Sequence, residues 1–378
     1  MNAATSTVRP RWSADRRARA GLSCAVEAGD PELGARLTDR EPVAVWRQVL
    51  VGELGPGPAE RAARLDLDEM QRRAELLRVR FVVPGDDEWP DGLADLGSSA
   101  GERRAGGPPV GLWLRGPVLL GSAMSRSAAV VGARACTAYG EGVAADLAAG
   151  LADAGVTVIS GGAYGIDAAA HQGALGVGGC TVAVLACGVD VPYPRGNARL
   201  FDQLAREQLL VSELPPGAHP TRSRFLTRNR LIAALSQGVV VVEAAIRSGA
   251  RNTAGWAGQC GRQLMAVPGP VHSALSEAPH QMIRDHEAVL VTSAAEVLEL
   301  ISPAGQFTLG PRRGATRPTD RLSVAQLAVF DALPPRRPAS TDEVALASGL
   351  AVGVCLAELA GLEDAGLVRA VASGWRLV

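Results

Sequence analysis

Short apolar runs alternate with longer amphipathic stretches through the middle of the chain, most clearly over residues 128–175. An apolar run at 128–132 stops at a glycine, and 139–154 then carries apolar residues at helical spacing. A β-branched run at 156–159 and a second helical stretch at 166–175 follow. This order predicts a βαβα unit, in which crossover helices join parallel strands. The loops of such a unit lie at the carboxyl ends of the strands, where open α/β sheets bind ligands.

The same alternation continues beyond this unit and predicts a doubly wound parallel sheet. The further expected strands are 181–186, 209–213, 239–243, 263–268 and 289–292, and two strand-like runs at 78–84 and 110–114 lead into them. The helices expected between them include 197–206, 225–235 and 253–260. The fold class is therefore α/β.

The two ends of the chain have other patterns. Residues 12–78 look helical and are broken at prolines, which predicts a small helical module that either contacts DNA or is inert. Residues 321–378 fit three short helices, at 323–333, 341–348 and 352–365, followed by a hairpin at 367–372 and 374–378. This is a winged-helix pattern. Its third helix carries acids and no arginine, which favours a protein-contact or structural role over DNA reading.

Composition restricts the possible functions. The net charge is −1, so any basic site is local. The chain has no lysine, and all 38 basic residues are arginine. The six cysteines are scattered without a C-x-x-C pair, which argues against a zinc site or a disulfide framework and fits a reducing cytoplasm. No apolar run is long enough for a transmembrane helix, so we expect no membrane contact.

Glycines follow the first two strands of the βαβα unit. Loops without Cβ atoms let backbone amides converge on an anion, and a helix N-terminus adds positive dipole. The alternative is that the glycines only permit tight turns between strand and helix. The loops match neither the dinucleotide fingerprint nor a Walker A loop, which needs lysine. The predicted phosphate-binding residues here are Gly132, Arg134, Ser160, Gly161, Gly162 and Gly165.

A second candidate region lies between Glu213 and Glu243, where there is no other acid. An aromatic residue among arginines is typical of single-stranded nucleic-acid binding, because guanidinium groups bind phosphates and rings stack on bases. The alternative is an ordinary solvated helix face, which usually mixes both signs of charge. The predicted binding residues are Arg222, Arg224, Phe225, Arg228, Asn229 and Arg230.

Two further loops contribute candidates at the same sheet edge. The segment PYPRGN follows a strand, and its prolines predict a rigid turn that presents Tyr193 and Arg195, or else only a rigid connection. The segment SGARNT opens a helix and offers Ser248, Gly249 and Thr253 to an anion.

Three other polar residues suggest a catalytic or metal-binding interpretation. Asp167 and His171 are four residues apart on one helix, but a metal needs more ligands, so buried hydrogen bonding is favoured. Glu243 ends an apolar strand and could act as a general base, although an ion pair with a nearby arginine is favoured.

Several motifs occur in an order that resembles the DNA-processing protein A family, also called Smf. They are GARACTAYG, SGGAYGIDAAAHQGAL, VLACGVDVPYPRGN, SELPPG, FLTRNRLIAALS, VVVVEAAIRSG and AVPG, within residues 128–300. One departure is Ala133, where the family usually has Ser or Thr.

The resemblance implies an extended Rossmann-like domain that binds single-stranded DNA, forms homodimers and loads the RecA recombinase in natural transformation. We expect no catalysis and no cofactor. It assigns DNA contacts to Arg134 and Arg195. The phosphate pocket that it implies comprises Gly161, Gly162, Gly165, Arg228, Asn229 and Arg230.

Pattern and resemblance together predict five parts of the chain. They are a disordered start (1–11), a helical, SAM-like module with its lead-in (12–97), a Rossmann-like DNA-binding domain (98–301), a linker (302–320) and a winged-helix domain (321–378). The rival function is a nucleotide-processing enzyme like the Rossmann-type phosphoribohydrolases. Those enzymes need a P-G-G-x-G-T-x-x-E loop with a catalytic Glu, and this chain has VEAAIRSGARNTA near that place.

Overall fold

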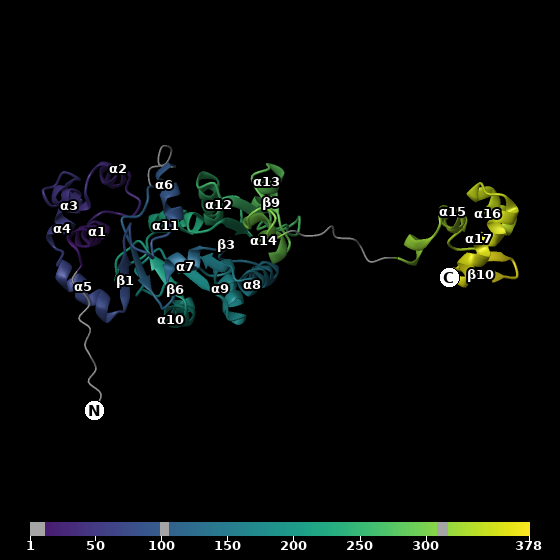
Figure 1. The fold of residues 1–378 in the computed structure, drawn as a ribbon, viewed down its shortest axis with the longest axis horizontal. Helices are drawn as coiled ribbons and strands as arrows, with labels where there is room; N and C mark the ends of the chain where they lie inside the picture. The colour runs from purple at the N-terminus through teal and green to yellow at the C-terminus, as the bar shows by residue number, and fades with distance from the viewer. Residues whose placement is uncertain (1–11, 99–105, 308–316) are drawn as a thin grey trace, which may run out of the picture. The chain divides into compact units, whose positions relative to one another are not determined.

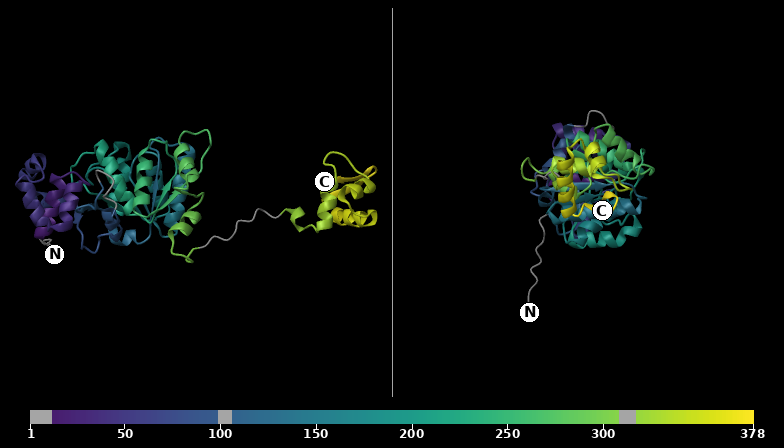
Figure 2. Two further views of the ribbon diagram at one scale, coloured as in Figure 1. Left: turned by 90° about the horizontal axis from the view of Figure 1, so that it is seen from above. Right: turned by 90° about the vertical axis from the view of Figure 1, so that its right-hand side faces the viewer.

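The computed structural model describes residues 12–98, 106–307 and 317–378, which form two compact units separated near residue 309 (Figures 1 and 2). Each unit is described by itself. The predicted disorder of residues 1–11 and the middle of the predicted linker lie outside the described residues, as do residues 99–105.

The first unit begins with a group of short helices that has its own apolar core around Leu22, Val45 and Val49. The helices are α1 (Ala14–Ala25), α2 (Pro31–Asp39), α3 (Pro42–Leu50), α4 (Pro56–Ala63) and α5 (Leu67–Leu76). Prolines at their first positions start α2, α3 and α4, because a proline there removes no helical hydrogen bond.

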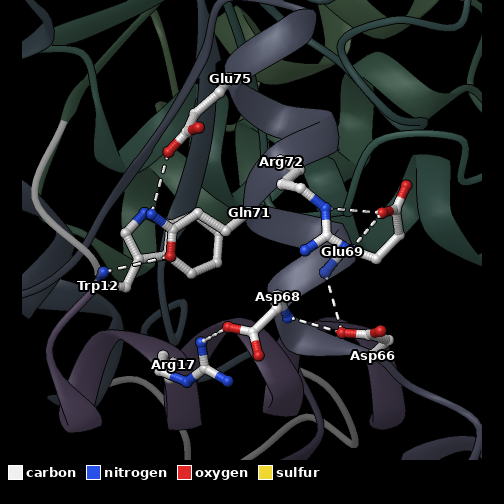
Figure 3. A network of polar contacts seen from close by, with 8 residues as sticks. All are labelled: Trp12, Arg17, Asp66, Asp68, Glu69, Gln71, Arg72 and Glu75. Atoms are coloured by element: carbon white, nitrogen blue, oxygen red, sulfur yellow. Dashed lines mark hydrogen bonds and ion pairs between the residues drawn. The ribbon is translucent and has the colours of Figure 1, made fainter. Parts of the chain in front are cut away.

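Polar contacts attach α5 to the start of α1 (Figure 3). Arg17 forms an ion pair with Asp68, and the backbone amide of Trp12 donates to Oε1 of Gln71 at 3.3 Å. Asp66 caps α5 by accepting hydrogen bonds from two amides of its first turn, at 2.9 Å each. These contacts hold α5 against the start of α1 within the helical module.

A nine-stranded sheet forms the centre of the first unit. Its strands are β1 (Val79–Val82), β2 (Leu112–Arg115), β3 (Ser127–Val131), β4 (Thr157–Ser160), β5 (Thr181–Val184), β6 (Leu209–Ser212), β7 (Gly238–Val241), β8 (Gln263–Ala266) and β9 (Val289–Leu290). Their spatial order is β1-β2-β6-β5-β4-β3-β7-β8-β9. The strands from β3 to β9 pair in parallel, whereas β2 pairs antiparallel with both β1 and β6.

The helices of this unit are η1 (Asp91–Ala94), α6 (Asp95–Ser98), α7 (Leu120–Met124), α8 (Ala138–Asp153), α9 (Ile166–Gly176), η2 (Arg195–Asn197), α10 (Ala198–Glu207), α11 (Arg222–Ala234), α12 (Gly249–Gln259), α13 (Glu277–Arg284) and α14 (Ala294–Ile301). They cover both faces of the sheet (Figure 1). Because side chains alternate along a strand, Ala129 and Val131 of β3 share a core with α11 and α12, while Ala128 and Val130 share one with α8, α9 and α14. The predicted doubly wound α/β fold is confirmed.

The second unit contains η3 (Pro318–Arg321), α15 (Val324–Ala332), α16 (Thr341–Ser348), α17 (Val352–Asp364), β10 (Val368–Val371) and β11 (Gly374–Leu377). Three helices and an antiparallel hairpin enclose one core, the arrangement expected of a winged helix. Within the described residues no single helix is long and apolar enough to cross a membrane. Helices α16 and α17 would be long and apolar enough only if taken together, and they meet at a bend of 104°.

Arg230 lies in the core of the first unit, which corrects its predicted place on a binding surface. Its side chain is fully buried, and two guanidinium nitrogens lie 2.8 Å from the two carboxylate oxygens of Glu213. Its Nε donates to the carbonyl of Gly107 at 3.1 Å. A guanidinium paired in this way ties α11 to the end of β6 and is not available to a ligand.

We predict that Arg230→Met destabilises the first unit by about 3–5 kcal/mol, because it leaves the Glu213 carboxylate buried without its partner. The double variant Glu213→Leu/Arg230→Met should recover most of this loss. Urea unfolding of the full chain, followed by tryptophan fluorescence, measures both. A single variant within about 0.5 kcal/mol of the parent would show that the pair is not a significant constraint.

His171 of α9 is also fully buried, and its hydrogen bond fixes its tautomer. Its Nδ1 lies 2.7 Å from the hydroxyl of Thr181, which already donates to the carbonyl of Val158 at 2.8 Å. Nδ1 must therefore donate. Burial, with a smaller contribution from the charge of Arg228, lowers the pKa of His171 from 6.5 to about 3.

This lowered pKa predicts acid sensitivity. The unfolded chain takes up a proton near pH 6.5 and the folded chain only near pH 3, so stability falls as the pH drops between these values. Between neutral pH and about pH 4.5, the free energy of unfolding of His171→Gln should therefore fall by about 2 kcal/mol less than that of the parent. Denaturant unfolding at both pH values measures this, with the exposed His219→Gln as the control. Equal losses in the parent and in His171→Gln would contradict the assignment.

Candidate nucleic-acid interface

A cavity of about 700 Å³ opens at the carboxyl edge of the sheet. It lies over the ends of β3 and β7, where the strand order reverses direction, with the end of β4 beside them. This is the position at which doubly wound folds bind ligands. Among the residues predicted from the sequence, the following line it: Gly132, Arg134, Tyr193, Arg222, Phe225, Arg228, Asn229, Ser248, Gly249 and Thr253.

Two aromatic rings and a guanidinium form one wall of the cavity. The ring centroids of Tyr193 and Phe225 are 5.7 Å apart, with the ring planes tilted by 52°. The guanidinium carbon of Arg134 lies 4.4 Å from the centroid of Phe225. Stacking fixes the plane of this guanidinium and leaves its N–H groups free to bind phosphate oxygens. Tyr193 is about half exposed, so its ring is accessible to a planar partner.

The N-terminus of α12 forms the opposite wall. Ser248 at the N-cap makes no side-chain capping bond, and its buried hydroxyl has no partner among the described residues. The side chain of Asn229 donates to the carbonyl of Gly249 and to Asn252, at 3.2 Å each, which fixes α12 against α11. Because the first amides of a helix lack intrahelical acceptors, this end of α12 can bind an anion.

The glycine loop after β4 binds the side chain of Asp167 from the same chain. The carboxylate of Asp167 accepts from the amide of Ala163 at 3.3 Å. Burial raises the pKa of Asp167, while the nearby Arg228 guanidinium and the amides of Ala163 and Gly161 oppose this rise. A Cβ at Gly161 would lie 1.9 Å from a guanidinium nitrogen of Arg228, so glycine makes room for the arginine. The loop amides predicted to hold a phosphate thus face a carboxylate.

The remaining predicted residues of this loop are structural. Gly162 and Gly165 have φ values of +69° and +73°, which glycine adopts without strain. A Cβ at Gly165 would also lie 2.4 Å from the carbonyl of Ala133, so the close approach of the two loops requires glycine. Ser160 is buried, and its hydroxyl donates to the carbonyl of Val130 at 2.7 Å. For these residues the alternative interpretation, tight turns and packing, describes what the structure shows.

The four arginines predicted as one cluster have different environments, although Arg224 and Arg228 lie about one turn apart on the same side of α11. Arg222 is exposed and lines the cavity. Arg224 makes two hydrogen bonds to Glu27 of the helical module, at 2.8 and 3.0 Å. Arg228 is buried at the cavity floor, where its guanidinium donates to the carbonyl of Val184. With Arg230 in the core, only the first of the four presents its charge to solvent at the cavity.

Two exposed arginines complete the interface. Arg195, in η2, is exposed on the same sheet edge but does not line the cavity. Arg247 lines the cavity directly before Ser248, and the sequence pattern misses it because it lies beyond Glu243, where the acid-free stretch ends. In the part of the chain that the structure describes, no ion pair neutralises either of them, nor Arg134 or Arg222. The edge therefore carries uncompensated positive charge.

Glu243 forms no ion pair with any arginine of the described residues, contrary to the expectation from the sequence. Its side chain is buried, and its two carboxylate oxygens accept from the amide and the hydroxyl of Thr137, at 2.8 and 2.6 Å. A Cβ at Gly140 would lie 2.3 Å from this carboxylate. Glu243 thus caps α8 from the next strand, because a carboxylate near a helix N-terminus is stabilised by the unpaired amides and the helix dipole.

The sequence is similar to a group of DNA-processing proteins. Residues 80–302 match the profile of the family described as DNA recombination-mediator protein A. The protein named "Putative DNA processing protein DprA" in Mycobacterium tuberculosis is 47% identical over 369 residues, which cover 96% of this chain and 94% of the relative.

Two solved structures share the fold. The DNA processing protein A of Streptococcus pneumoniae aligns with a TM-score of 0.62 and 31% identity, over 78% of this chain and 99% of that one. The DNA processing protein A of Helicobacter pylori, whose title concerns its single-stranded DNA binding mode, aligns with a TM-score of 0.50 and 25% identity over 58% and 94%. Matching fold, matching motifs and extensive identity lead to one conclusion: the chain belongs to the DNA recombination-mediator protein A family.

Proposed function

We propose that this chain is a non-catalytic protein that binds single-stranded DNA at the carboxyl edge of its sheet. The observation that carries the proposal is the cavity in which unpaired arginines, an aromatic pair and an uncapped helix N-terminus converge. The arginines and the helix N-terminus can bind phosphates, and the aromatic pair can stack on unstacked bases. A duplex hides its base faces, so this combination favours single strands.

In the proposed complex each wall has its own role. Arg134 and Arg222 bind phosphates from one side, while Arg247 and the first amides of α12 bind them from the other. Tyr193 supplies a face for a base, and Phe225 supports the guanidinium of Arg134. The buried side chains of Asp167 and Arg228 shape the floor beneath them and are not themselves ligands for the DNA.

We further propose that the chain acts as a homodimer that protects single strands and loads the RecA recombinase onto them, during DNA uptake or recombination. The named relatives and the Helicobacter pylori structure support DNA processing and single-strand binding. RecA loading and the homodimer rest on the resemblance of the motifs. The winged-helix unit, beyond the predicted linker at 302–320, would contact protein, since Leu346 and Leu356 are exposed and the acids of α17 repel DNA.

The two carboxylates that could serve an enzyme of the phosphoribohydrolase type already accept hydrogen bonds from the chain itself, which supports a non-catalytic role. Both oxygens of the Glu243 carboxylate are bound by Thr137, and the Asp167 carboxylate lies against loop amides and Arg228. Glu243 does not line the cavity, and Asp167, which does line it, is held by a loop amide.

We predict that Arg134→Ala/Arg222→Ala weakens binding of a labelled poly(dT) strand at least tenfold. Removal of each phosphate-binding arginine should lower the slope of log affinity against log salt by about 0.7, so the double variant should reduce it by about 1.4. Fluorescence titrations at several salt concentrations measure both quantities. The matched control is Arg47→Ala/Arg206→Ala, which removes two exposed arginines of α3 and α10 and should keep the parent slope. Unchanged affinity and slope in the first variant would refute this DNA interface.

We predict that the chain releases no free base from nucleoside monophosphates. Chromatography of the nucleotides after long incubation with the chain tests this. Base release that disappears in Glu243→Gln or Asp167→Asn would overturn the non-catalytic proposal and favour the enzyme.

A further inference from the structure

Outside the cavity, one aromatic side chain at the same edge is fixed in place while its ring stays in solvent. Tyr164 directly follows Ala163, which lines the cavity, and 48% of Tyr164 is exposed. Its hydroxyl accepts from the amide of Gly196 at 3.2 Å. The side chain of Asn197 donates to the carbonyls of Gly162 and Ala163 at 3.1 Å each. These bonds join the loop after β4 to the loop after β5.

The fit between these loops is close. A Cβ at Gly196 would lie 2.6 Å from the hydroxyl of Tyr164, so the ring and the neighbouring loop are in direct contact. A ring held in this way has little rotational freedom left to lose when a ligand stacks on it. The exposed face of Tyr164 is therefore suited to stack on a flat partner.

Charge distinguishes the two sides of the cavity. Tyr139 is the comparable ring on the other side, with 43% exposure and its hydroxyl donating to the carbonyl of Pro268 after β8. Two exposed acids lie near it: Glu141 is two residues further along α8, and Glu277 follows Ser276, which like Tyr139 lies against Gly269. On the side of Tyr164, toward β5, the strand order places the exposed cation Arg195.

A second exposed cation, Arg199, follows Arg195 across the junction of η2 and α10. Within the described residues neither arginine has an ion-pair partner. A phosphate backbone leaving the cavity would meet carboxylates in the direction of Tyr139 and guanidinium groups in the direction of Tyr164.

We propose that Tyr164 is a second stacking position for single-stranded DNA and that the strand leaves the cavity toward β5. On this path a base stacks on Tyr164 while Arg195 and Arg199 bind the phosphates beside it. The proposal rests on the proposed single-strand binding and adds to it a direction and a longer site. A strand that only fills the cavity does not reach Tyr164, whereas a longer strand does.

The test compares strands of different length on the full chain. Affinities are measured for labelled oligo(dT) of about 4 and about 16 nucleotides, the range of site sizes for single-strand binding folds. Tyr164→Ala should weaken binding of the longer strand about tenfold and leave the shorter one unchanged. Its salt slope should stay at the parent value, because a ring neutralises no phosphate. Arg199→Ala should lower that slope by about 0.7 on the longer strand only.

Two variants separate stacking from a structural role. Tyr164→Phe loses the bond to Gly196 but keeps the ring, so it should bind the longer strand nearly as well as the parent. Tyr139→Ala should bind both strands as the parent does. The proposal is overturned if Tyr164→Ala binds the longer strand normally, if Tyr164→Phe is as weak as Tyr164→Ala, or if Tyr139→Ala is equally weak. A parent chain that binds neither strand would instead refute the proposed function itself, and this proposal with it.

Discussion

The carboxylate of Glu243 holds together the two loops on which the cavity depends. Glu243 lies just after β7, and its carboxylate accepts hydrogen bonds from the amide and hydroxyl of Thr137 at the start of α8. The backbone carbonyl of Glu243 accepts from the amide of Ala133 at 2.7 Å. The loops after β3 and β7 are thereby held at one spacing. Arg134 lies on the first loop and Ser248 on the second, so this contact sets the distance between the two walls of the cavity.

Much of the fold follows from local patterns of the sequence. The run at 239–243 and the observed β7, Gly238–Val241, agree closely because a strand buried on both faces must be continuously apolar. The three helices predicted for the winged-helix unit also agree closely with the observed α15, α16 and α17. The antiparallel pairing of β2 with β6 was not predictable in this way, since a run at 110–114 has the same period whichever neighbour it joins.

The site was predictable in position but only partly in its residues. A parallel sheet brings the loops after β3 and β7 together whatever their side chains, so their place followed from topology. The role of each arginine on α11 depended on which part of the structure its side chain packs against and on whether it finds an acidic partner there. Arg224 met Glu27 and Arg230 met Glu213, and both partners are distant in sequence. Composition counts charges, whereas long-range packing decides which of them remain free.

The absence of lysine gives the interface a chemical property of its own. Every cation at the cavity is a guanidinium, which is not a substrate for lysine acetylation. Cells that weaken DNA binding by acetylating amines would have no such control over this surface. Amine-directed cross-linkers would likewise find no side chain to label, so reagents directed at guanidinium groups or carboxylates are needed to map its complexes.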